Sequence, residues 1–332
     1  MPAPPIVSRH DPPVAITTHD EWQKHGGPAS KDHWVRGRSA WELACDWIER
    51  DAADRVVELL TLRPELAGLT LNEGVAEKQT HFDEQRRGPR NHDLLVRATA
   101  NVGRVTIGIE GKADESFDDP VWLWQDKRLK ATPDSGAPAR IDRLTRQWFG
   151  TTLRTDHDHP SLACIGYQLF SALAGTLADA KTDGSAIAVL LVQEFDTDRT
   201  EPSKHDVNAR VLDDFVRRLG GPDLERSGTD AGWITAPTHV RGDGVWTPTQ
   251  LPSVWRSSGE SSKSDHRSRA AGVNRLLVRS PQPRLAVGLA QQVRCSSIAA
   301  LSAKRSPRVK EEPRPALLLV ARSRSHQPLA IG

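Results

Sequence analysis

Residues 186–192, Ala-Ile-Ala-Val-Leu-Leu-Val, are the feature that most constrains the fold. A run of seven apolar residues is too short to span a membrane and is typical of a strand covered on both faces. Such a strand needs a layer of helices on each side of its sheet. Apolar spacing predicts one long core helix over 161–180 and another helix over 207–219, which ends at Gly220-Gly221. Trp233-Ile234 is expected to be a final short strand.

A hairpin is predicted upstream of this run. Residues 93–97 form its first strand, 101–103 its turn and 104–112 its second strand. In the second strand the valine and isoleucines at positions 105, 107 and 109 share one face, because side chains of a strand alternate. Glu110 and Lys112 therefore lie together on the opposite face.

The first helix of the domain is predicted to begin at Ser39. Ser39 and Glu42 have the spacing of a capping box, and apolar residues at intervals of three and four continue towards Arg50. A second helix is expected over 54–62. The order of elements predicts a three-layer α/β domain over residues 33–245, with a central mixed sheet flanked by helices.

Charge separates the C-terminal part of the chain from the rest. Of 45 basic and 43 acidic residues, 15 basic and four acidic ones fall in residues 246–332, which leaves 30 basic and 39 acidic ones in residues 1–245. The basic, Ser/Arg/Pro-rich residues 246–332 are predicted to be a disordered tail, either a nucleic-acid-binding arm or a solvated segment. Residues 1–32 are predicted to be a disordered leader.

Asp93, Glu110 and Lys112 form the candidate catalytic group. Two carboxylates on adjacent strands can share a hard divalent cation, Mg²⁺ or Mn²⁺. Lys112 beside them could orient the attacking water or neutralise charge on a phosphate. The alternative is an ordinary salt bridge on a solvated face of the sheet.

These segments resemble the core of the PD-(D/E)XK, restriction-endonuclease-like superfamily, and more narrowly a bacterial group with a D…E-G-K core. The resemblance covers roughly residues 34–220 and rests on four segments, in chain order Gly37–Ala44, Asn91–Leu95 with Ile107–Phe117, Tyr167–Thr176 and Ala188–Phe195. It implies a restriction-endonuclease-like fold and a metal-dependent nuclease in which Asp93 and Glu110 hold the metal and Lys112 assists the nucleophile.

Two further site residues follow from the same resemblance. Glu42 matches a carboxylate that many members carry on the first helix, and the capping box is its alternative role. Gln168 occupies a position where many members place a polar residue near the active site, next to Tyr167, the chain's one tyrosine. The alternative for both Gln168 and Tyr167 is the edge of a helix whose apolar face is core.

Other candidates are weaker. Asp156-His157-Asp158-His159 offers metal-ligand residue types, but without a visible fourth ligand we interpret it as a solvated loop. Seven tryptophans could stack on unpaired bases or anchor the core; they are Trp22, Trp34, Trp41, Trp47, Trp122, Trp124 and Trp148. Three widely spaced cysteines indicate no disulfide framework, and with no secretory signal or membrane span the expected location is the cytoplasm.

Three classes of function remain open. The first is a metal-dependent nuclease acting on nucleic acid, with DNA as the expected substrate, in defence or repair. Its acidic domain should repel phosphates, although residues 86–90 and Arg140, Arg143 and Arg146 could line a basic cleft. The second is a binding or regulatory module that keeps the nuclease fold without catalysis. The third is an interaction protein whose function lies in the tail.

Overall fold

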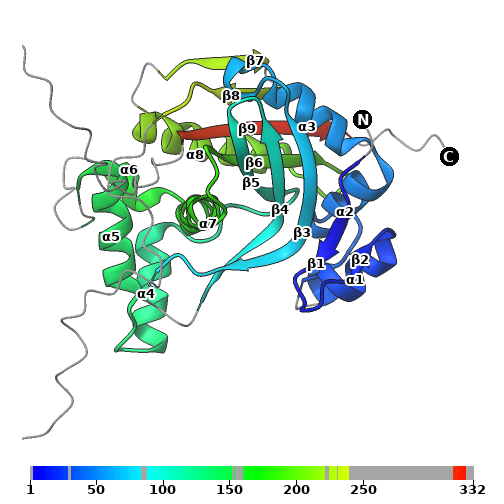
Figure 1. Ribbon diagram of the computed structural model, residues 1–332. Coiled ribbons are helices and arrows are strands. Elements are labelled where there is room, and N and C mark those ends of the chain that lie inside the picture. Colours follow the sequence, from blue (N-terminus) through cyan, green and yellow to red (C-terminus); the bar gives the residue numbers. More distant parts are fainter. Residues whose placement is uncertain are drawn as a thin grey trace, which may run out of the picture. The chain divides into compact units, whose positions relative to one another are not determined.

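The fold is built around one mixed β-sheet (Figure 1). The computed structural model describes residues 3–28, 31–83, 88–151, 153, 160–220, 224–229, 231–238 and 317–326, all within the unit formed by residues 1–250 and 313–332. In this part of the chain the sheet has the order β2-β1-β3-β4-β5-β6-β9-β8-β7. The strands are β1 (Ile6–Ser8), β2 (Ala15–Ile16), β3 (Thr70–Thr80), β4 (Arg90–Ala100), β5 (Gly103–Lys112), β6 (Ile187–Asp196), β7 (Arg226–Thr229), β8 (Gly232–Thr235) and β9 (Leu317–His326).

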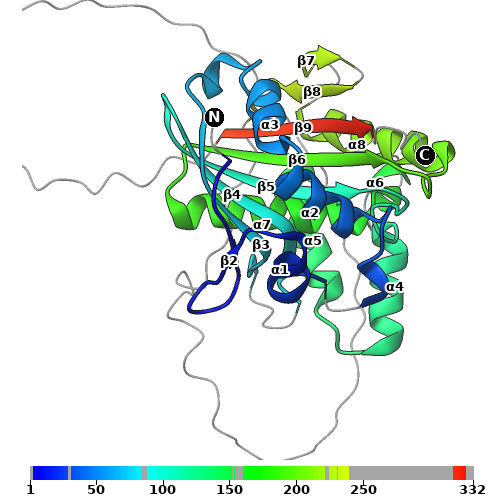
Figure 2. The ribbon, with the colours of Figure 1, turned by 90° about the vertical axis from the view of Figure 1, so that its right-hand side faces the viewer.

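Helices cover both faces of this sheet, as predicted for a three-layer α/β protein. In Figure 2 the helices α1, α2 and α3 lie in front of the sheet and α4, α5 and α7 lie behind it. The helices are α1 (His19–Gly26), α2 (Ser39–Glu49), α3 (Ala52–Leu60), α4 (Val121–Ala131), α5 (Ala137–Phe149), α6 (Pro160–Cys164), α7 (Tyr167–Asp183) and α8 (Pro202–Gly220). Each face of the sheet has its own apolar core, one shared with α2 and α3 and the other with α5, α7 and α8.

The predicted hairpin and the predicted buried strand are confirmed. β4 and β5 pair antiparallel from Leu94↔Ile109 to Ala100↔Gly103, and β5 pairs parallel with β6 over eight residues. Residues Ile187–Phe195 of β6 are all buried, because β6 has neighbours on both edges and helices on both faces. The arrangement brings the ends of β4, β5 and β6 together.

α7 packs closely on the sheet through two glycines. A Cβ atom on Gly108 of β5 would collide with Thr176 Oγ1, and one on Gly175 of α7 would lie 2.7 Å from His92 Nε2. Approaches this close exclude any side chain at either position. α7 is therefore held tightly against β4 and β5 near their functional residues.

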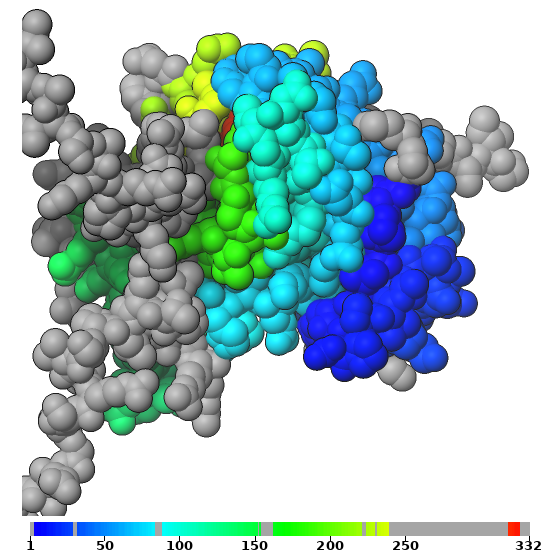
Figure 3. Space-filling model, in the orientation of Figure 1, coloured from blue at the N-terminus to red at the C-terminus, as the bar shows by residue number. Residues whose placement is uncertain are grey.

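The N-terminal residues fold, contrary to the prediction of a disordered leader. Within residues 3–28, β1 pairs with β3 and α1 packs beside it, so these residues share one surface with β3 (Figure 3). Thr18 and Glu21 form a capping box at the start of α1, with Glu21 N donating to Thr18 Oγ1 at 3.1 Å. Burial of Ile6, Ile16 and Trp22 in the core shared with α2 stabilises this segment.

The prediction for residues 246–332 is wrong for residues 317–326. These residues form β9, which pairs parallel with β6 over ten residues and antiparallel with β8. β9 folds because its first apolar residues are buried in the two cores and its backbone is paired on both edges. The rest of the predicted tail lies outside the described residues.

The predicted helix over 161–180 is interrupted at Gly166. Val121 N donates to Ile165 O, and Tyr167 N donates to Asp119 O, so these backbone groups bond to a loop rather than continuing one helix. A Cβ on Gly166 would collide with the carbonyl oxygen of Phe117. The segment therefore forms two helices, α6 and α7.

The apolar helices and the thiols of the described residues bear on the expectations of no membrane span and no disulfide framework. No helix in this part of the chain is long and apolar enough to cross a membrane. Cys45 and Cys164 are free thiols, and Cys295 lies outside the described residues.

Candidate functional site

β5 presents Glu110 and Lys112 on the face covered by α7, as the alternation predicted. Lys112 Nζ donates to Glu110 Oε1 at 2.9 Å. The two residues are 1% and 4% exposed, so this pair does not lie on a solvated face of the sheet. The alternative interpretation was a salt bridge on a solvated face of the sheet. The salt bridge is present, but it is buried.

Arg90, the first residue of β4, supplies a second cation to the same carboxylate. Its guanidinium forms an ion pair with Glu110 Oε2. Burial lowers the pKa of both Arg90 and Lys112, and the negative charge of Asp93 opposes this shift in each. Arg90, Glu110 and Lys112 are called the Glu110 cluster below.

Asp93 lies where β4 separates from β5. The pairing of the two strands ends at Leu94↔Ile109, and Asp93 Oδ2 accepts a 2.8 Å hydrogen bond from Gly111 N, between Glu110 and Lys112. Glu77 of β3, with φ of 50°, lies close enough to Asp93 for the two charges to interact. Burial, then the charge of Asp93, raises the pKa of Glu77 to about 8.

The regular alternation of side chains along β4 is broken at Asp93. Leu94 packs in the core beneath α2, whereas His92 lies against Gly175 of α7. In a regular strand residues 92 and 94 would share one face. The strand therefore turns at Asp93, which directs the Asp93 carboxylate to the backbone of β5 instead of into either core.

Glu42, the third predicted carboxylate, has local partners. It is buried on α2, where Oε1 accepts from Gly37 N at 3.0 Å and Oε2 forms a 3.2 Å ion pair with Arg50. The predicted capping box is wrong, because Ser39 donates its hydroxyl proton to Glu115 instead. None of the contacts described for Glu42 joins it to Asp93 or to the Glu110 cluster.

A pocket of about 780 Å³ lies beside the Glu110 cluster. It is lined by residues from the loop before β4 and from α4, α5 and the start of α7, among them Arg90, Trp124, Arg128, Arg140, Tyr167 and Gln168. Arg140, which was expected to line a cleft, and Gln168, which the resemblance places near the active site, both line this pocket. Arg86 and Arg87 lie outside the described residues, and Arg143 and Arg146 are not among the lining residues.

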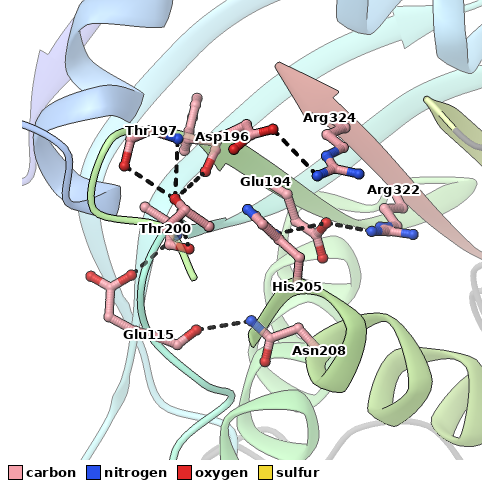
Figure 4. Close-up of polar contacts among 11 residues, drawn as sticks. Glu115, Glu194, Asp196, Thr197, Thr200, His205, Asn208, Arg322 and Arg324 are labelled. Carbon is pink, nitrogen blue, oxygen red and sulfur yellow. Dashed lines mark hydrogen bonds and ion pairs between the residues drawn. The ribbon is translucent and has the colours of Figure 1, made fainter. Parts of the chain in front are cut away.

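A second buried group of charges lies on the next strand of the sheet, where Glu194 is the register partner of Lys112, between β6, β9 and α8 (Figure 4). Arg322 forms a 2.5 Å ion pair with Glu194 Oε2, and His205 Nδ1 lies 3.5 Å from the same oxygen. Burial alone would raise the pKa of Glu194, but the side chains of His205 and Arg322 lower it. Glu194, His205 and Arg322 are called the Glu194 cluster below.

The donor set at Asp93 and Glu110 fits Mg²⁺. Magnesium usually keeps several waters and takes one or two protein carboxylates together with substrate phosphates. Glu110 Oε2 is a buried oxygen without a hydrogen bond of good geometry, and it would be available to an ion if Arg90 moved. The described residues include no group of three or more His, Cys, Asp or Glu side chains arranged around an ion.

The remaining candidates do not join the site. Residues 156–159 lie outside the described residues. Trp22, Trp34, Trp47 and Trp148 are buried in the cores, Trp41 packs half-buried against one of them, and Trp122 is exposed on α4. Trp124 is also a buried core residue, and it is the one predicted tryptophan that lines the pocket. The sequence interpretation of most tryptophans as core anchors is confirmed.

Sequence reasoning missed Glu77 and the partnership of Arg90 with Glu110. The strand that carries Glu77 has mixed polar and small residues, Thr-Leu-Asn-Glu-Gly-Val-Ala-Glu-Lys-Gln-Thr, without regular alternation. Arg90 was expected only as part of a basic stretch. No local pattern could have identified either role, because both depend on pairing between β3, β4 and β5.

The chain belongs to the family described as a domain of unknown function (DUF6946), whose model matches residues 15–238. β9 and β1 lie outside the matched residues. No curated protein and no solved structure matches the chain.

Proposed function

We propose that this protein is a metal-dependent nuclease with a restriction-endonuclease-like fold, which hydrolyses phosphodiester bonds of DNA. One observation carries the proposal: Glu110 and Lys112 are bonded to each other on the buried face of β5, and Asp93 reaches the backbone between them. Asp93 on β4 and the Glu110–Lys112 pair on β5 are the residue types of a D…E-x-K site, and they lie at neighbouring ends of these two strands. The resemblance of residues 34–220 to that superfamily supports the same function.

The chain's own residues have distinct tasks in such a reaction. Asp93 and Glu110 would hold a Mg²⁺ ion, which supplies Lewis-acid activation of the phosphate and of water when bound. Lys112 can orient the attacking water or give a proton to the leaving oxygen, and its lowered pKa makes proton release easier. Hydrolysis forms one P–O bond from water and breaks the ester P–O bond, whose oxygen takes up a proton.

One observation favours a binding module without catalysis as the second candidate. Arg90 already forms an ion pair with Glu110, on the oxygen that a metal ion would need. If Arg90 stays there when substrate binds, the cluster is a permanent charge network. The nuclease proposal requires Arg90 to release Glu110 when metal and phosphate enter.

Cleavage of labelled DNA by the full-length chain tests the proposal. Wild-type protein is incubated with single-stranded and duplex DNA in Mg²⁺ or Mn²⁺, beside Glu110→Gln and Lys112→Met. Both variants should cut at least about a hundredfold more slowly, the loss typical of removing one group that stabilises a transition state.

Glu194→Gln is the matched control, because it changes another fully buried carboxylate on the neighbouring strand. It should cleave like wild type once circular dichroism shows it is folded. A folded wild type that cuts no DNA with either metal contradicts the nuclease proposal and favours the binding module.

A further inference from the structure

The pocket beside the Glu110 cluster has an aromatic wall. The rings of Trp124 and Tyr167 stack with centroids 3.5 Å apart and planes inclined by 11°. The Arg128 guanidinium lies 5.3 Å from the centre of the Trp124 ring, and Arg128 is exposed. Aromatic rings with an arginine beside them recur where proteins bind flat bases, and Trp124 and Tyr167 both line this pocket although each is 8% exposed.

Arg90 places a buried cation at the inner side of the same pocket. Arg90 is 8% exposed, and its Nε atom has no hydrogen-bond partner among the described residues. A buried donor without a partner is destabilising, so an acceptor that reached Nε from the pocket would gain a strong hydrogen bond. Gln168 and Asn91 add amide donors and acceptors to the lining.

The pocket is less acidic than the domain as a whole. Three arginines and two aspartates line it, whereas residues 1–245 contain 39 acidic and 30 basic residues. Arg90 and Arg140 already form ion pairs with Glu110 and Asp83, so Arg128 is the lining arginine that no described ion pair neutralises. A long phosphate backbone laid over an acidic surface binds weakly, because such binding depends on Lys and Arg contacts. An anion held in one locally basic pocket avoids that repulsion.

We propose that this pocket binds one unpaired nucleotide of the substrate, with its base against the Trp124–Tyr167 platform and its phosphate or carbonyl oxygen on Arg90. The proposal rests on the nuclease function and names its substrate class as DNA with a single-stranded or extruded nucleotide next to the cleaved bond. The volume of the pocket lies within the range of small-ligand sites, about 300–1,000 Å³.

Calorimetric titration of the full-length protein with dAMP, in the presence of EDTA, tests the pocket without metal or cleavage. Wild type should show saturable binding. Trp124→Leu should weaken it by about tenfold or more, since stacking contributes about 1–3 kcal/mol per base. Trp124→Phe should retain most of the affinity, which separates lost stacking from a folding defect. Arg128→Ala should weaken binding severalfold.

Lys130→Ala is the matched control, because Lys130 lies exposed on α4, pairs with Asp126 and is not among the lining residues. It should bind dAMP like wild type. Absence of saturable dAMP binding, unchanged affinity in Trp124→Leu, or equal affinity for inorganic phosphate would overturn the nucleotide pocket.

Lys112→Met separates this proposal from the nuclease function. It should bind dAMP normally while failing to cleave DNA. A wild type that cleaves DNA but does not bind dAMP refutes the pocket alone, and one that binds dAMP but cleaves nothing supports the pocket and refutes the hydrolysis.

Discussion

The Glu110 cluster and the Glu194 cluster are built from the same kinds of side chain but differ in their surroundings. Each has a carboxylate with almost no exposed surface held by two cationic or potentially cationic partners. The Glu110 cluster borders a large pocket through Arg90, and none of the Glu194 cluster lines that pocket. A buried charged cluster is therefore not enough to indicate a ligand-binding site. A candidate site also needs a pocket through which a ligand can reach it.

The Glu194 cluster connects elements that are distant in sequence. Glu194 belongs to β6, His205 to α8 and Arg322 to β9 (Figure 4). On the same helix Asn208 donates to Glu115 O at 2.9 Å, and Glu115 lies three residues after the end of β5. The cluster thus fastens β9 and α8 beside the site, which is a structural role.

The largest expected effect is from removing β9. A chain ending at residue 316 should lose its cooperative unfolding transition, because burial of Leu318, Leu319 and Val320 contributes roughly 1.5–3 kcal/mol per side chain. That loss approaches the whole stability of a typical domain, about 5–15 kcal/mol. Urea denaturation followed by tryptophan fluorescence measures it, and a truncated chain as stable as the full one would show that β9 is dispensable.

Breaking the Glu194 cluster should have the next largest effect. Arg322→Met leaves a buried Glu194 carboxylate without its arginine and should destabilise the fold by about 3–5 kcal/mol. Arg324→Met is the matched control on the same strand, because its ion pair with Asp196 is partly exposed and should contribute under about 1 kcal/mol. Equal losses in the two variants, measured by chemical denaturation, would contradict the structural role of Glu194.

The third effect concerns pH. The pKa of Glu77 is raised to about 8 from an ordinary 4.5, so between these values Glu77 is more protonated in the folded protein than in the unfolded chain. The contribution of Glu77 to the free energy of unfolding should therefore decline as pH rises from about 4.5 to 8, and Glu77→Gln should remove this decline, whereas the lowered pKa of His92 contributes in the opposite sense in both proteins. Denaturation curves across this pH range measure both slopes.

Glu194→Gln should leave that decline unchanged, because the pKa of Glu194 is shifted in the opposite direction. A lowered pKa gives stability that is present above the unfolded value and is lost only as pH falls through the folded one. If Glu194→Gln flattened the decline above pH 4.5 as much as Glu77→Gln, the assignment of the raised pKa would be wrong.

Local patterns in the sequence predicted the elements whose neighbours are close in the chain. The alternation of β5 and the apolar run of β6 identified both strands and placed Glu110 and Lys112 on one face. The capping box of Thr18 and Glu21 was also visible in the sequence, although residues 1–32 were predicted to be disordered. Attention to that spacing would have found α1.

The remaining features depend on contacts between distant segments. β9 starts with five apolar residues and continues with Arg-Ser-Arg-Ser-His, a composition that alone gives no reason to fold. Its order comes from β6 and β8 on its two sides. Ser39 likewise bonds to Glu115, 76 residues away, in preference to the local cap that its spacing suggested.

Calorimetric titration of Mn²⁺ into the full-length protein tests most directly whether the Glu110 cluster, and not the Glu194 cluster, is the functional one. Wild type and Glu194→Gln should release the same heat of binding. Asp93→Asn should abolish it while keeping the fold, since the amide oxygen of the substituted side chain can still accept the hydrogen bond from Gly111 N. Loss of binding in Glu194→Gln, or binding that survives in Asp93→Asn, would contradict the account.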